Sequence, residues 1–534
     1  MKLLLIASAL LPSALALWPL PTSYTNGTTP LTLSKSFNIK IDIANPPADL
    51  VAAVSRAKGY LQNDKLEALV IDRGASSASA IAKAKSLPSL TLSLTGKGSV
   101  QSISAQAVAP LESRVEGANS TLGLFRGLAT FGQIWFDLNG ATYTLSAPIQ
   151  ISDSPAYPYR GFMLDTARNY FPVADIKRTI DAMSWVKINT LHWHIVDSQS
   201  FPLEVPGFLS LSQKGAYSAT SVYSPSDVKD IITYAAARGI DVIPEIDTPG
   251  HTSVISKAFP EHIACAEATP WASFANEPPA GQLRLASEAT VNFTGSLLKA
   301  AAGLFESHYF STGGDEVNAN CYTQDNETQA SLESTNKTFA QALDTFVQSN
   351  HAALRSVGKS AVVWEEMVLA NPVTLANDTI VMVWISSDDV QAVAETGYRI
   401  VHAASDYFYL DCGHGGWVGD FPTGNSWCDP FKTWQYAYSF DPTANLTAAQ
   451  SELVIGGQSL LWTEQSSSAN LDSTTWPRAA STAELFWSGP GGNVDTALPR
   501  LHEVVYRFRQ RGVAANSLQP EWCALRPFAC DLTA

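Results

Sequence analysis

The chain is poor in positive charge. It carries 34 lysine and arginine residues against 49 aspartate and glutamate residues, which gives a formal net charge of −15 at pH 7. A protein that binds nucleic acid is expected to present a basic patch, so this balance argues against a nucleic-acid partner. An acidic surface suits an exported enzyme that works at mildly acidic pH.

Long apolar runs are missing after the first residues. No later stretch of about 18 apolar residues appears, so we expect no membrane span. At the start, Lys2 precedes a mostly apolar run and the small-residue pattern Ala14-Leu15-Ala16, which is typical of a cleavage site. We therefore expect residues 1–17 to be a signal peptide and the mature protein to be secreted. Seven glycosylation sequons agree with export: Asn26, Asn119, Asn292, Asn326, Asn336, Asn377 and Asn445.

Cysteine is also scarce, with six residues in 534. No Cys-x-x-Cys pair and no cysteine–histidine cluster has the spacing of a metal site, so the composition favours disulfides over zinc. Six cysteines allow 15 pairings. The easiest loop closures join Cys412 with Cys428 and Cys523 with Cys530, which leaves Cys265 and Cys321 as the third pair.

The first part of the mature chain mixes short alternating strands with two amphipathic helices. We predict from this pattern a small α+β domain over residues 18–155. The expected strands are 37–43, 90–94 and 100–103, and the expected helices are 48–61 and 123–135.

After residue 155 the pattern changes to short apolar strands that are separated by helices. Eight such strands predict the α/β class and a parallel (β/α)₈ TIM barrel over residues 156–534. In such a barrel the functional residues lie at the C-terminal ends of the strands. The expected strands are 161–165, 190–196, 241–246, 309–312, 361–364, 380–384, 400–403 and 453–461.

Polar and aromatic residues gather at all eight of these strand ends, and the most informative group is Gly313-Gly314-Asp315-Glu316. Neighbouring side chains of a regular strand point to opposite faces, so the two carboxyls share a pocket only if the glycines let the chain turn. Two carboxyls in one pocket titrate differently, and one can stay protonated as a general acid. An isolated Asp-Glu pair is more often solvated in a loop. Here several tryptophans accompany it, and tryptophan faces pack on sugar rings, so the set indicates glycoside hydrolysis.

Six motifs, in order along the chain, resemble the glycoside hydrolase family 20 β-N-acetylhexosaminidases of the secreted, fungal kind. They are RGFMLD at 160–165, HWHIVD at 192–197, PEIDTPGH at 244–251, GGDE at 313–316, YLD at 409–411 and WTE at 462–464. The resemblance covers nearly the whole mature chain. It also implies that the N-terminal domain is similar to the zincin-like domain that precedes the barrel in this family.

The resemblance implies exo-acting removal of terminal β-linked N-acetylglucosamine, or N-acetylgalactosamine, from chitooligosaccharides or glycans. The reaction would be substrate-assisted and retaining, with no metal and no cofactor. Glu316 would be the general acid and then the base, and Asp315 would hold the 2-acetamido group. Asp197 and His251 would form a relay to Glu316. The substrate-binding residues that the resemblance implies are Arg160, Trp364, Trp384, Tyr409, Asp411, Trp462 and Glu464.

Other residues near these motifs are expected to support the site. Asp165 and Arg168 would brace it, while His192 and His194 alternate on a strand and would pack there. Ser311 stands where many family members have a histidine, so one supporting hydrogen bond is uncertain. The loop between the Cys412 and Cys428 positions holds Trp417 and Trp427 and is expected to shape the next sugar site.

Three alternatives stay open at this point. The same carboxylates would serve a lacto-N-biosidase-like enzyme or a transglycosylating relative, which product analysis distinguishes. A catalytically silent glycan-binding protein is a third reading, although a lectin needs no acid pair. The family resemblance also makes a homodimer plausible.

Overall fold

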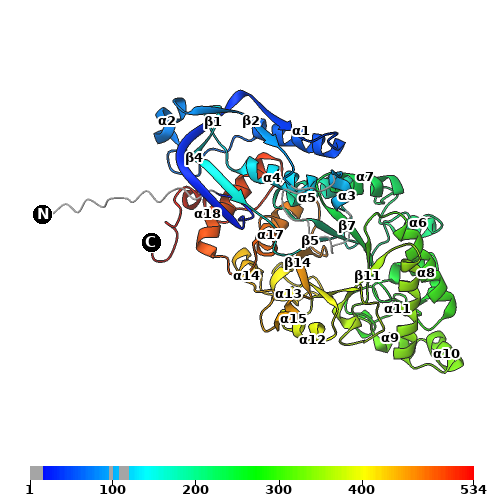
Figure 1. The fold of residues 1–534 in the computed structure, drawn as a ribbon. Coiled ribbons are helices and arrows are strands. Elements are labelled where there is room, and N and C mark those ends of the chain that lie inside the picture. The colour runs from blue at the N-terminus through cyan, green and yellow to red at the C-terminus, as the bar shows by residue number, and fades with distance from the viewer. Residues whose placement is uncertain (1–15, 96–99, 108–119) are drawn as a thin grey trace.

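The computed structural model describes residues 16–95, 100–107 and 120–534. The expected signal peptide falls almost wholly outside the described residues, and so does the sequon at Asn119. Figure 1 shows a smaller N-terminal part, in blue and cyan, packed against one side of a larger part that runs from green to red.

The N-terminal part is a four-stranded sheet in the order β2-β1-β4-β3, with β1 and β2 parallel. Both helices expected here are present, α1 and α4, but the strand expected at 100–103 is wrong. Ile103 is fully buried in the N-terminal core and begins helix α3, because a run of four residues is too short to reveal its period. The elements are β1 (Ser23–Ile41), β2 (Lys85–Leu92), β3 (Phe136–Leu138), β4 (Ala141–Ser152), α1 (Ala48–Asn63), α2 (Ala78–Ala82), α3 (Ile103–Ala107) and α4 (Thr121–Gln133).

The larger part is a closed barrel in the order β10-β11-β12-β13-β14-β5-β6-β7, and its paired strands are parallel. The predicted fold class is therefore confirmed. The strands are buried on both faces, which explains why they read as continuous apolar runs. They are β5 (Tyr159–Asp165), β6 (Thr190–Val196), β7 (Asp241–Ile246), β10 (Tyr309–Gly313), β11 (Ser360–Trp364), β12 (Ile380–Val383), β13 (Arg399–His402) and β14 (Val454–Leu461).

Helices surround the barrel, and sequence signals mark where several of them begin. Ser224 caps α7 in a capping box with Pro225 at the first helical position, and Thr338 does the same for α11. Among the described residues, no helix combines the length and the apolar character that crossing a bilayer requires. The longer helices are α5 (Val173–Trp185), α7 (Pro225–Ala236), α8 (Glu288–Ala302), α10 (Asn326–Thr335), α11 (Phe339–Arg355), α17 (Arg478–Ser488) and α18 (Val494–Gln510).

Shorter helices and a two-stranded sheet lie in the connections. The small sheet pairs β8 (Ile263–Ala264) with β9 (Gln282–Leu283) in the long loop after β7. Its place matters because that loop also carries His251. The short helices are α6 (Leu209–Gly215), α9 (Ala319–Gln324), α12 (Val390–Glu395), α13 (Ser405–Phe408), α14 (Trp434–Tyr438), α15 (Ala448–Ser451), α16 (Leu471–Thr475) and α19 (Glu521–Ala524).

Candidate active site

The glycine pair at the end of β10 makes the turn that the sequence predicts. Gly313 has φ +62° and Gly314 has φ +105°, and Glu316 follows with φ +52°. A Cβ on Gly313 would lie 2.0 Å from Oδ1 of Asp247, and one on Gly314 would lie 2.6 Å from Cγ of Met367. Both positions therefore require glycine for space as well as for conformation.

The turn brings Glu316 next to a histidine from the loop after β7. Nε2 of His251 lies 3.3 Å from Oε2 of Glu316 and 3.8 Å from Oδ2 of Asp315. The other ring nitrogen, Nδ1, is 3.1 Å from Oδ1 of Asp197, which follows β6. The residues expected to form the relay are thus in contact, in the expected order.

The charges in this group set where its protons lie. Burial lowers the pKa of His251, but the charges of Asp197 and Asp315 raise it well above its usual value. Burial raises the pKa of Glu316, but the contact and the charge of His251 outweigh burial and lower it. Without a ligand, the proton between these two groups therefore rests on His251.

Asp315 shares its side of the pocket with a second buried acid, Asp247. Burial first, and then the charge of Asp247, raise the pKa of Asp315 well above its usual value. Burial raises the pKa of Asp247 to about 7. Oxygen atoms of both carboxyls and a nitrogen of His251 lie within 4.8 Å of one another. Two acids this close and this buried hold a proton between them.

An aromatic wall stands beside the carboxyls. Trp384 and Tyr409 are stacked, with ring centroids 6.3 Å apart and planes at 12°, and Trp462 lies 6.3 Å from Tyr409. Trp364 is 6.3 Å from Trp462, so the four rings are contiguous. Nε1 of Trp384 donates to Glu366, whose pKa is raised to about 7 by burial and by the charge of Asp315. Met367, the residue after Glu366, packs against Gly314, so the wall stands beside the turn that carries Asp315.

The loop closed by Cys412 and Cys428 extends this wall toward solvent. Trp427 packs edge-on against Trp384 at 5.8 Å and against Tyr409 at 5.9 Å, yet 67% of it is exposed. Trp417 in the same loop is 39% exposed. An exposed aromatic face beside a buried pocket is suited to stack a second ring of an extended ligand.

The assignment of Arg160 to the sugar site is wrong. Arg160 is the second residue of β5, at the N-terminal end of the barrel, opposite to the carboxyls. Its guanidinium donates to the backbone carbonyls of Lys187 and Tyr157 and lies over the ring of Trp487. It lines a cavity of about 870 Å³ between the barrel and the N-terminal sheet. The motif begins at the start of a strand, so its first residue cannot reach the far end.

The arginine at the carboxyl end is Arg168, three residues after β5 ends. Its Nη2 is 3.0 Å from Oδ2 of Asp197, and its guanidinium lies 4.9 Å from the ring centre of Trp462. Its Nε donates to Glu277 at 2.9 Å. Glu277 comes from the long loop after β7, where no periodic pattern gave a signal, and the sequence reasoning missed it.

The two acids expected to bind sugar hydroxyls, Asp411 and Glu464, are both half-buried. Burial raises the pKa of Asp411 to about 7, and it raises the pKa of Glu464 well above its usual value although Arg168 opposes this. Both carboxyls are thus largely neutral at mildly acidic pH. Neutral carboxyls donate as well as accept hydrogen bonds, as sugar hydroxyls do.

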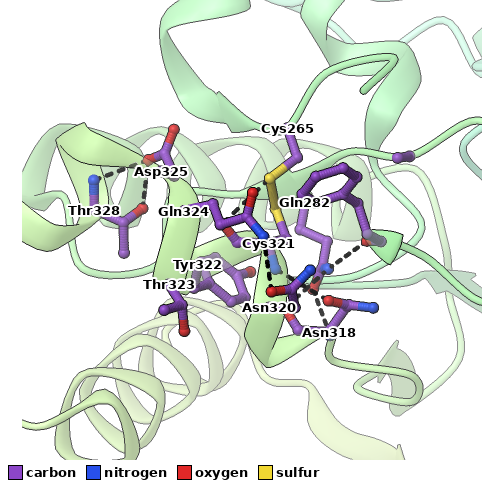
Figure 2. The surroundings of a disulfide bond; sticks show 12 residues. Cys265, Gln282, Asn318, Asn320, Cys321, Tyr322, Thr323, Gln324, Asp325 and Thr328 are labelled. Atoms are coloured by element: carbon purple, nitrogen blue, oxygen red, sulfur yellow. Dashed lines mark hydrogen bonds between the residues drawn. A yellow bond between two sulfur atoms is a disulfide. The ribbon is translucent and has the colours of Figure 1, made fainter. Parts of the chain in front are cut away.

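Disulfides hold two of the loops that surround the pocket. The structure joins Cys265 to Cys321, Cys412 to Cys428 and Cys523 to Cys530, the pairs expected from the spacing. Figure 2 shows the first of these, which links the loop after β7 to α9, just beyond Glu316. Beside it, the side chain of Gln282 accepts a hydrogen bond from the backbone of Asn318 at 3.0 Å.

Two groups of side chains in the pocket have the spacing of metal ligands. Asp197, His251 and Glu277 form one group, but the guanidinium of Arg168 already contacts both carboxylates. Asp247, His251 and Asp315 form the other, in which the raised pKa values of the acids favour a proton. A third group, Asp411 with Cys412 and Cys428, contains disulfide-bonded sulfurs.

Comparison with known proteins identifies the family of this chain. The family model for the catalytic domain of glycosyl hydrolase family 20 matches residues 157–490. A β-hexosaminidase of Arthroderma benhamiae is 36% identical over 443 residues, which is 78% of this chain and 72% of that protein. A chitooligosaccharidolytic β-N-acetylglucosaminidase of Bombyx mori is 37% identical over 423 residues, 76% of this chain and 70% of that protein.

Similarity of fold to a solved structure supports the same family. The crystal structure of the chitobiase of Flavobacterium johnsoniae superposes with a TM-score of 0.73 at 25% identity, covering 93% of this chain and 73% of that one. The family model spans more than half of the chain, and the curated relatives exceed a third in identity. The chain therefore belongs to glycosyl hydrolase family 20.

Proposed function

We propose that this protein is an exo-acting, retaining β-N-acetylhexosaminidase that removes terminal β-linked N-acetylglucosamine, or N-acetylgalactosamine, from chitooligosaccharides or glycans. The observation that carries the proposal is the turn at Gly313 and Gly314, which sets Asp315 and Glu316 side by side against His251. Both β-hexosaminidases and a chitooligosaccharidolytic enzyme are among the similar proteins, which supports it further.

Proton delivery is assigned to Glu316. In the ligand-free pocket the proton rests on His251, within 3.3 Å of Glu316. A sugar that enters the pocket removes water from around Glu316, which raises the pKa of its carboxyl and draws the proton across. Glu316 then protonates the glycosidic oxygen as that oxygen leaves, and later takes a proton from the water that attacks C1.

The nucleophile is assigned to the substrate. The acetamido carbonyl oxygen attacks C1 as the bond from C1 to the leaving oxygen breaks, which gives a cyclic oxazolinium ion with no bond to the protein. Asp315 holds the acetamido N–H and stabilises the positive charge. That charge lowers the pKa of Asp315, so the proton it shares passes to Asp247. Water then opens the ring at C1 with net retention.

Substrate binding is assigned to the walls of the same pocket. Trp364, Trp384 and Trp462 would enclose the acetamido group, and Tyr409 would donate a hydrogen bond to its carbonyl oxygen. The ring hydroxyls would be bound by the acids Asp411 and Glu464. Arg168 takes the place first expected for Arg160, because Arg168 lies at the carboxyl end of the barrel and Arg160 at the other end. Trp427 would stack on the next sugar.

Export and glycosylation are part of the proposal. Six of the seven sequons fall on described residues, and five of these asparagines are exposed while Asn26 is half-buried. The protein has three disulfides, and disulfides form and persist in proteins that fold in an oxidising compartment.

The test is the release of nitrophenol from the aryl N-acetylglucosaminide and from the plain aryl glucoside. The first substrate is expected to be cleaved and the second to be inert, because glucose lacks the acetamido nucleophile. Glu316→Gln is expected to abolish turnover while the protein still binds N-acetylglucosamine. Equal rates on the two substrates, or an ester trapped on a side chain, would overturn the mechanism.

A further inference from the structure

A chain of buried polar side chains continues inward from Asp197, along the interior of the barrel. His194 Nε2 lies 2.8 Å from Oδ2 of Asp197, and His194 Nδ1 lies 2.5 Å from Oε1 of Glu245. The other oxygen of Glu245 is 3.0 Å from Nε2 of His192. His192, His194 and Glu245 are all completely buried. The two histidines, which the sequence placed as packing residues, are members of this network.

The inner end of the network fixes the hydrogen-bonding roles of His192. Tyr159 donates its hydroxyl hydrogen to Oε1 of Gln458 at 2.6 Å, which leaves the amide nitrogen of Gln458 to donate to Nδ1 of His192 at 3.1 Å. His192 therefore accepts at Nδ1 and donates from Nε2 to Glu245.

The contacts of His194, the second histidine, fix its protonation. Both ring nitrogens of His194 face carboxylates, so both must carry protons, and the ring is an imidazolium. Burial lowers the pKa of His194, but its hydrogen bonds to Asp197 and Glu245 raise it to about 10. The groups that face this ring from other elements are Arg168, 3.4 Å away, and the edge-on ring of Trp462, 4.9 Å away.

Glu245 is held as a carboxylate by three donors. His192 and His194 donate to it, and so does the hydroxyl of Ser311 from the neighbouring strand β10. Ser311 is the residue of β10 that pairs in register with Glu245 of β7. Burial raises the pKa of Glu245, and the donors together lower it far below its usual value. The hydroxyl of Ser311 thus makes a supporting hydrogen bond at the position that the sequence left uncertain.

We propose that Glu245 and His194 are positioning residues for the reaction: Glu245 fixes the His194 imidazolium, which fixes the charge and orientation of the Asp197 carboxylate that holds His251. The inference rests on the function proposed above. Glu316 then stands at the pocket end of a row of side chains with alternating negative and positive charge, which extends into the interior of the barrel. Glu245 and His194 act through Asp197 and are not assigned any contact with the substrate.

The experiment compares two variants that remove opposite charges. His194→Gln removes a positive charge and Glu245→Gln a negative one, at nearly constant side-chain volume. In the kcat–pH profile of aryl N-acetylglucosaminide cleavage, the basic limb reports the ionisation of the acid. Asp197 lies between the two imidazoles, and the Arg168 guanidinium contacts both rings at 3.4 and 3.5 Å. At this short separation the limb is expected to move by about one to two pH units, upward in His194→Gln and downward in Glu245→Gln.

The remaining readouts separate positioning from general damage. KM is expected to change less than about threefold while kcat falls by about tenfold or more, since neither residue binds substrate. The double variant is expected to return the limb toward the wild-type pH, because it restores the net charge. Basic limbs that stay in place, or that move in the same direction in both variants, would overturn the proposal.

Ser311→Ala is the milder test, because it removes one donor and keeps every charge. It is expected to fold and to lower kcat by about three- to tenfold, the value of one buried hydrogen bond. If the two charge variants do not fold, an unchanged kcat in Ser311→Ala overturns the inference alone. A wild-type protein that does not cleave the N-acetylglucosaminide contradicts the proposed function instead, so the two failures are distinguishable.

Discussion

Replacing Gly313 by alanine is expected to disable the pocket at a measurable cost in stability. The new Cβ would lie 2.0 Å from Oδ1 of Asp247 and 2.2 Å from its Cγ, so the acid or the backbone must move. Alanine at φ +62° costs about 1–2 kcal/mol. Overpacking a buried site costs about 1–3 kcal/mol more. We therefore expect the free energy of unfolding to fall by about 2–5 kcal/mol.

The effect on catalysis should be larger than the effect on stability. Oδ1 of Asp247 accepts a hydrogen bond from the backbone N–H of Gly314 at 2.8 Å, so displacing Asp247 also displaces the turn. Asp315 and Glu316 follow directly. Misplacing a catalytic group by 1 Å costs about 100-fold, and we expect a fall in kcat of at least about that size.

Gly140→Ala is the matched control. Gly140 has φ +84° in the turn between β3 and β4, and its added Cβ would meet nothing within 4 Å. It therefore carries the backbone cost without the collision. Denaturant unfolding and steady-state cleavage of the aryl N-acetylglucosaminide measure both effects. If Gly313→Ala is no less stable and no less active than Gly140→Ala, the steric argument fails.

Three further outcomes are expected. Trp427→Ala should lower kcat/KM for chitooligosaccharides by about tenfold, the contribution of one stacked ring, and change kcat/KM for the aryl substrate by less than about threefold. The control is Trp522→Ala, which removes another half-exposed tryptophan and should leave kcat/KM unchanged for both substrates. Equal losses on both substrates in Trp427→Ala would contradict the stacking role. Arg160→Gln should lower the melting temperature while kcat and KM stay near wild type, because this guanidinium donates to backbone carbonyls at the N-terminal end of the barrel. A raised KM would instead support the expected role of Arg160 in sugar binding. Between about pH 4 and 7 three carboxyls with raised pKa values bind more protons in the folded chain than in the unfolded one, so their contribution to the free energy of unfolding should fall as pH rises. The melting temperature should thus be higher at pH 5 than at pH 7.5, and the reverse order would show that the carboxyls ionise freely. The groups responsible are carboxyls whose pKa burial raises to about 7, Asp247, Asp411 and Glu366.

The barrel could be read from the sequence because its strands are buried on both faces. Such strands are short unbroken apolar runs, and turn residues and helices mark their ends. All eight predicted strands lie within two residues of the observed bounds at either end. The same rule placed the carboxyls, since strand ends of a parallel barrel share one rim.

Two features of the site could not be read in this way. Arg160 is the second residue of a seven-residue strand that spans about 20 Å, and Arg168 follows the other end. The two arginines therefore stand at opposite ends of the barrel although they are close in sequence. The network of His194, Glu245 and Ser311 joins three strands, and no local pattern reports which inward side chains meet. Only the register of β7 with β10 brings Ser311 to Glu245.

The link between Cys265 and Cys321 ties catalysis to the way the chain is made. It closes a segment of 56 residues that contains Glu316 and begins in the loop that carries His251. A closure of this length contributes about 4 kcal/mol in the chain-entropy model. Chains produced in a reducing cytosol would still assemble the eight strands, whose pairing needs no sulfur. They would lack the brace between the segments that bring acid and histidine together. Heterologous expression should therefore be judged by turnover per folded molecule and not by yield.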